Sequence, residues 1–173
     1  MNIHPIFVHF PIALLTLYSL MELLQFKKMR EYQPWLLIKG AFLVLGTLSS
    51  FAALQTGEMA EHIAGHGKLV ETHSTMAAIT VWVFITLSVI YIVRIINTEF
   101  AQIKDWLWNA KYICTIWNIL SRITDFIFTQ WWILIILGII GVILITIVGA
   151  LGGAIVYGST ADPAVSFIYN LFF

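Results

Sequence analysis

Apolar residues run along this chain in four long blocks, separated by shorter polar stretches. Three blocks reach the roughly 20 apolar residues that a helix needs to cross a bilayer, and the first does so if two histidines are tolerated. The pattern predicts transmembrane helices at about residues 5–26, 35–55, 68–96 and 131–157. The predicted fold class is all-α, an integral membrane four-helix bundle that forms a single domain over residues 1–173.

The segment between the third and fourth blocks is too polar to span a membrane. Its polar side chains recur at a near-heptad spacing that forms one stripe along a helix, namely Lys104, Lys111, Thr115, Asn118, Arg122, Asp125 and Thr129. Aromatic residues fill much of the rest, including Trp106, Trp108, Tyr112 and Trp117. This combination is typical of an amphipathic helix in the membrane interface, predicted here at about residues 103–129. The alternative is a cytoplasmic helix docked on the bundle.

Basic residues predict the orientation of the helices. Eight lysines and arginines flank or lie within the first and third connections: Lys27, Lys28, Arg30, Lys39, Arg94, Lys104, Lys111 and Arg122. Only Lys68 lies at the opposite end. By the positive-inside rule, we expect a multi-pass protein of the cell (inner) membrane with both termini on the outer, periplasmic side.

Composition removes several classes of function. The chain is 60% hydrophobic and 10% charged, and its formal net charge of zero carries no electrostatic footprint for nucleic acid. The single cysteine, Cys114, excludes an internal disulfide and any site built from several cysteines. The sequence also lacks the CxxCH motif, so haem is not attached in the c-type manner.

The five histidines occupy two short stretches that the predicted topology brings to the outer face. His4 and His9 open the first helix, while His62, His66 and His73 lie before and within the start of the third. An ionisable side chain within a membrane segment is costly, and it is a functional candidate for that reason. Their depths suggest His9 with His73 as a deep pair, and His4 with His66 as a shallow pair.

A b-type haem between two helices is the first hypothesis for these imidazoles, because such haems are held by axial histidine pairs. His9 and His73 are the predicted axial ligands, and His4 and His66 would hold a second haem or bond to propionates. Small residues near the right depth would line the slot: Ala77, Ala78, Gly149, Gly152 and Gly153. The chain would then be a cytochrome subunit that passes electrons between membrane quinol and an outer-side partner.

Two other hypotheses remain open. A non-haem metal would use the histidines and carboxylates around the third helix start, His62, His66, His73, Glu58, Glu61 and Glu71, although no HExxH spacing occurs. Alternatively, His9 and His73 hydrogen-bond to neighbouring helices in a structural or accessory subunit without a cofactor. All three hypotheses place the chain in a lipid bilayer, together with other membrane subunits or a cytochrome partner.

The opening HPIFVHFPIALL resembles the signature of a bacterial membrane-protein family catalogued as domain of unknown function 2231. Three further features are similar: the dipeptide Thr56-Gly57, the histidine His73, and the GGxxVYG-like end from Gly152 to Gly158. The resemblance covers the four predicted spans, and the long aromatic insert departs from it. The family's function is unassigned. Related domains occur beside cytochrome c modules, so the resemblance implies electron transfer.

Overall fold

The computed structural model describes residues 4–24, 26–30, 32–64, 67–100 and 111–173, which are helical over most of their length. The helices are α1 (His4–Leu23), α2 (Lys27–Arg30), α3 (Gln33–Ala64), α4 (Lys68–Glu99), α6 (Lys111–Thr129), α7 (Trp131–Tyr157) and α8 (Pro163–Phe172). Within these described ranges there is no strand. The predicted all-α class is therefore confirmed.

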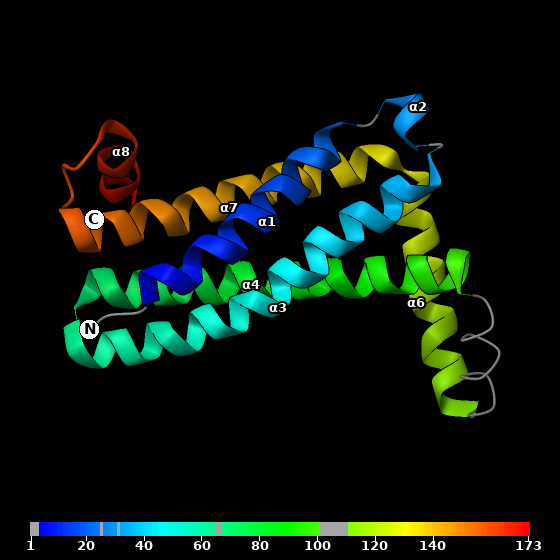
Figure 1. The fold of residues 1–173 in the computed structure, drawn as a ribbon, viewed down its shortest axis with the longest axis horizontal. Helices are drawn as coiled ribbons and strands as arrows, with labels where there is room; N and C mark the ends of the chain where they lie inside the picture. The colour runs from blue at the N-terminus through cyan, green and yellow to red at the C-terminus, as the bar shows by residue number, and fades with distance from the viewer. Residues whose placement is uncertain (1–3, 25, 31, 65–66, 101–110) are drawn as a thin grey trace.

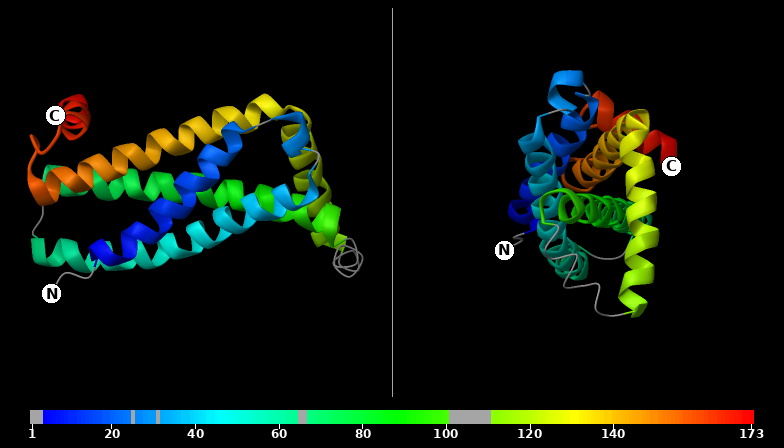
Figure 2. Two further views of the ribbon diagram at one scale, coloured as in Figure 1. Left: turned by 45° about the horizontal axis from the view of Figure 1, so that its top comes forward. Right: turned by 90° about the vertical axis from the view of Figure 1, so that its right-hand side faces the viewer.

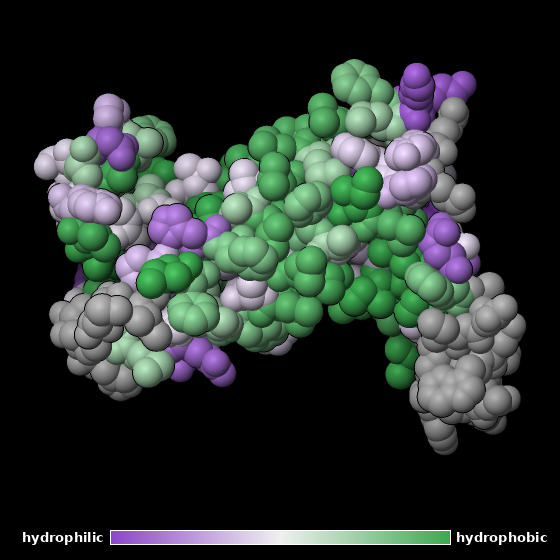
Figure 3. Space-filling model, in the orientation of Figure 1, coloured by the Kyte–Doolittle hydropathy of each residue, from purple (hydrophilic) through white to green (hydrophobic). Residues whose placement is uncertain are grey.

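Four of these helices, α1, α3, α4 and α7, are long and apolar enough to cross a membrane. They run back and forth along one axis, with α1 packed on α3 and α7, and α4 packed on the same two helices (Figures 1 and 2). Hydrophobic side chains cover the middle of the surface, while hydrophilic ones gather towards the two ends (Figure 3). The chain thus has the helices and surface of a multi-pass membrane protein, and both termini lie at one end (Figure 1).

Glycines allow α1 to approach its neighbours closely. A Cβ added at Gly46 of α3 would lie 2.7 Å from Leu15, and one at Gly138 of α7 would lie 2.9 Å from the Ser19 carbonyl. Two glycines of α7 that are four residues apart differ in their surroundings. Among the described residues, no heavy atom beyond the local helix would lie within 4 Å of a Cβ at Gly149, whereas a Cβ at Gly153 would lie 3.4 Å from Val165 of α8.

The helix boundaries follow the prediction at α7, which spans the predicted residues 131–157, and at the start of α4. They differ in α3, which was predicted to end near residue 55 and continues past Gly57 to Ala64. A glycine inside a helix costs only about 1 kcal/mol, which packing readily outweighs. His62 consequently lies within the last turn of this helix.

The α6 helix crosses one end of the bundle at a steep angle (Figure 2). Its first predicted part, with Trp106 and Trp108, lies outside the described residues. Polar groups attach the helix to α4: Asn97 donates to the Ser121 hydroxyl and accepts from the Trp117 indole, at 2.9 and 3.1 Å. The indole N–H of Trp117 thus has a partner within the chain.

The opposite face of α6 carries exposed apolar side chains at helical spacing, Ile116, Ile119, Ile123 and Phe126. On a helix at a water-facing surface, such residues would be turned towards the core. This arrangement supports the predicted interfacial position, which stays a prediction.

Candidate functional site

His4, the first residue of α1, lies against α3 at the end of the bundle that holds both termini (Figure 1). Its Nδ1 is 3.0 Å from the hydroxyl of Thr56, and a Cβ at Gly57 would lie 3.2 Å from its Cε1. The Thr56 hydroxyl donates its one proton to the Ala52 or Ala53 carbonyl, at 2.9 and 3.0 Å. With its proton so engaged, the hydroxyl can accept from His4 Nδ1–H, and this contact ties the start of α1 to α3.

His73 lies in the second turn of α4, half-buried against α7. Its Cε1 would be 3.2 Å from a Cβ at Gly152, and its ring lies beside the Val148 carbonyl. The Nδ1 atom is buried and has no hydrogen-bond partner within the described part of the chain. An unsatisfied buried polar atom of this kind costs about 1–3 kcal/mol.

The imidazoles of His4 and His73 lie close enough to interact electrostatically. Each of the four long helices contributes to this histidine site. The two rings come from α1 and α4. Each packs against the backbone of a glycine, His4 against Gly57 of α3 and His73 against Gly152 of α7, and we call these two positions the glycine seats. The arrangement presents two imidazoles to one region, at the end of the bundle where the termini lie.

His9 takes no part in this pair. Its side chain is exposed on α1, and its Nδ1 bonds to the carbonyl of Pro5 on its own helix. Five residues separate His9 from His4, which corresponds to about 140° around a helix, so the two side chains face different neighbours. The imidazole that interacts with His73 among the described residues is that of His4. The assignment of His9 and His73 as a ligand pair stays a prediction.

The structure places only some of the other predicted ligands. His66 and the side chain of His62 lie outside the described residues, while Glu58 and Glu71 are exposed. Within the ranges that the structure describes, no three side chains of His, Cys, Asp or Glu gather as a metal site would require. The non-haem metal hypothesis therefore gains no support from the described residues.

A second polar site, which the sequence analysis did not predict, is centred on Glu22 of α1. Glu22 is fully buried and accepts hydrogen bonds from Lys39 of α3, at 2.8 Å, and from the hydroxyl of Tyr91 of α4. The hydroxyl of Tyr18 is buried nearby and interacts electrostatically with Glu22. Within the described residues, no hydrogen bond of standard geometry links the two side chains. Ionisable residues within two apolar helices were the available signal, but Lys39 was counted only as a marker of orientation.

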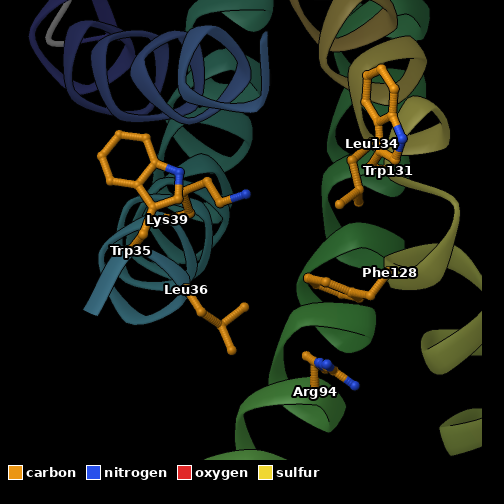
Figure 4. A pocket seen from close by; sticks show the side chains of 7 residues that line it. All are labelled: Trp35, Leu36, Lys39, Arg94, Phe128, Trp131 and Leu134. Atoms are coloured by element: carbon orange, nitrogen blue, oxygen red, sulfur yellow. The ribbon is translucent and has the colours of Figure 1, made fainter. Parts of the chain in front are cut away.

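A pocket of about 170 Å³ lies beside this buried ion pair. Its lining comes from α3, α4, α6 and α7, with the residues Trp35, Leu36, Lys39, Arg94, Phe128, Trp131 and Leu134 (Figure 4). It is well separated from the histidine site. Along α7, Gly138, which contacts Glu22, lies 14 residues from Gly152, or about 21 Å at the rise of an α-helix.

Comparisons with known protein families, with curated proteins and with solved structures found no match to this chain. The resemblance to the membrane-protein family of unknown function therefore stays a prediction. The candidate sites are defined by the geometry of this chain alone.

Proposed function

We propose that this protein is a membrane electron-transfer subunit that holds a b-type haem with His4 and His73 as its axial ligands. The observation that carries the proposal is the convergence of these two imidazoles from α1 and α4 at one end of the bundle. The proposal keeps two further points of the sequence-based hypothesis. The protein lies in the inner membrane, and the end of the bundle that carries the two histidines faces the outer side.

The residues fit a haem in three respects. The Nδ1 of His4 lies 3.0 Å from the Thr56 hydroxyl, and metal-binding histidines commonly bond to such a partner through their second ring nitrogen. His73 has a buried ring nitrogen without a hydrogen-bond partner among the described residues. Gly57 and Gly152 remove the side chains that would otherwise occupy the space beside the two rings.

The size of the ligand set favours haem over a bare metal ion. A structural zinc site takes four protein ligands, whereas the described residues bring only His4 and His73 together. A b-type haem needs no more than two axial ligands from the protein, and when bound it supplies reversible one-electron chemistry at the iron. The chain's own contribution would be to orient the imidazoles and to exclude water from them.

A second candidate is a structural subunit without a cofactor, and one observation favours it. Both imidazoles already contact the glycine seats, at 3.2 Å from the position of a Cβ. Such packing would lock α1 to α3 and α4 to α7 with no further group. His4 also has a hydrogen-bond partner in Thr56.

The absorption spectrum of the purified protein separates the two candidates. We expect a Soret band and a reduced-minus-oxidised spectrum in the wild type, and their loss in His4→Ala and His73→Ala. His9→Ala is the matched control, because this histidine is exposed and bonds to its own helix. A wild type without haem, or a spectrum that survives both substitutions, would support the structural role. Loss of the spectrum in His9→Ala but not in His4→Ala would refute the assigned pair.

A further inference from the structure

The pocket beside Glu22 and Lys39 is unusual in its lining. Two cations, Lys39 and Arg94, line it together with aromatic and aliphatic side chains, and no acidic side chain does so. The indole nitrogen of Trp35 is buried and has no hydrogen-bond partner in the described part of the chain. Figure 4 shows this nitrogen and the Lys39 ammonium on the side of α3 that faces Arg94 and Phe128. The lining thus presents N–H donors and no acceptor side chain.

The ion pairs that Lys39 and Arg94 form differ in strength. Lys39 is matched by Glu22, which is as deeply buried as the lysine, and the pair is held at 2.8 Å. Arg94 bonds to Asp125 at the same distance, but 59% of the Asp125 side chain is exposed. Exposed ion pairs contribute little, about 0–1 kcal/mol. Arg94 is therefore free to exchange this partner for another anion at small cost.

The position of the pocket defines the source of that anion. Trp35 is the third residue of α3, and Trp131 is the first residue of α7, so the pocket lies at the ends of two membrane helices. Tryptophans at helix ends mark the level of lipid headgroups. This end also carries most of the basic residues, which the positive-inside rule assigns to the cytoplasmic leaflet, where anionic lipids give a negative surface potential.

We infer that this pocket binds the phosphodiester headgroup of an anionic phospholipid. Arg94 supplies the charge-assisted hydrogen bonds to the phosphate. Trp35 donates its indole N–H, and Lys39, whose charge is balanced by Glu22, lines the buried side. Phe128 and Trp131 cover the glycerol part. The inference is independent of haem binding, since the histidine site lies at the other end of the bundle.

The inference is tested by titrating detergent-purified protein with phosphatidylglycerol and following its thermal unfolding. Phosphatidylcholine with the same acyl chains controls for the tails, and inorganic phosphate controls for a free ion. We expect phosphatidylglycerol alone to raise the unfolding temperature. In Arg94→Gln and in Trp35→Phe, the apparent affinity should fall about tenfold, as the loss of one charge-assisted or buried hydrogen bond predicts.

Arg122→Gln is the matched control, because Arg122 is an exposed cation on α6 that does not line the pocket. It should bind phosphatidylglycerol as the wild type does. An equal response to phosphatidylcholine or to inorganic phosphate would overturn the inference. So would an equal loss of affinity in Arg122→Gln, which would indicate general surface charge, or full affinity in both pocket variants. Trp35→Phe keeps an aromatic ring in place, so it remains informative if Arg94→Gln does not fold.

Discussion

The backbone of Gly152 lies directly against the imidazole of His73, so that a Cβ at residue 152 would be 3.2 Å from Cε1. This distance is shorter than nearly all real Cβ contacts, and the ring would have to shift by a few tenths of an ångström. The glycine therefore sets where the histidine can lie. The same relationship holds between Gly57 and His4, with the same distance.

Gly152→Ala should displace His73 and weaken the histidine site, whereas Gly149→Ala should not. Both glycines lie in α7, and no heavy atom of the described residues beyond the local helix would come within 4 Å of a Cβ at residue 149. Thermal unfolding and haem content of the two purified variants provide the measurement. Equal behaviour of the two variants would show that the contact between Gly152 and His73 has no influence on the site.

Thr56→Val should weaken the site while leaving the imidazole of His4 in place. The substitution keeps the shape of the side chain but removes the hydroxyl that lies 3.0 Å from Nδ1. Loss of such an outer partner typically lowers the affinity of a metal site by about 10–100-fold. Haem titration of the apoprotein measures this change, and Thr72→Val is the control, because its exposed hydroxyl bonds only within α4. An unchanged affinity in Thr56→Val would count against His4 as a ligand.

The buried ion pair gives a prediction on stability. Glu22→Gln should destabilise the protein by about 3–5 kcal/mol, because it leaves the charge of Lys39 buried without its carboxylate. The double variant Glu22→Gln/Lys39→Met should recover much of this loss, since no buried charge remains unpaired. Unfolding of the three proteins in mixed micelles measures the difference. A single variant as stable as the wild type would mean that water or another group neutralises Lys39.

The sequence predicted the transmembrane helices well because their signal is composition over about 20 residues, as α7 illustrates. It failed at Gly57, where a residue that usually interrupts helices is retained inside α3 as the seat of His4. The partner of His73 depends on which turn of α1 faces α4, and that is set by packing rather than by local pattern. The spacing of His4 and His9 indicates side chains about 140° apart around α1, but it does not tell which of them faces α4.

The buried site was missed for a different reason. Glu22 and Lys39 lie 17 residues apart in the chain and become partners only when α1 and α3 pack together. When Glu22 and Lys39 are considered separately, each is an ionisable residue near the end of an apolar helix, which is typical of the boundary between membrane and water. Only the structure shows that both are buried and that Tyr91 completes the site from α4.

The orientation can be tested with single cysteines in a Cys114→Ser background. Lys28 and Lys68 are both exposed and lie at opposite ends of the bundle. Because the basic residues gather at the end of Lys28, an impermeant thiol reagent added to intact cells should label residue 68 and not residue 28. Labelling after lysis controls for reactivity. The reverse pattern would place the histidine site and both termini on the cytoplasmic side.

The position of α6 can be tested in the same background with spin labels at Ile116 and Arg122. Ile116 lies on the exposed apolar face of the helix, and Arg122 belongs to the predicted polar stripe and is also exposed. The two positions lie about 120° apart around the helix. A helix in the interface plane turns its apolar face into the acyl boundary. In reconstituted protein, the label at 116 should be relaxed by oxygen, which concentrates in lipid. The label at 122 should be relaxed by a water-soluble nickel complex. Two water-accessible labels would indicate a helix docked above the membrane, and two lipid-accessible labels would indicate a segment buried in the bilayer.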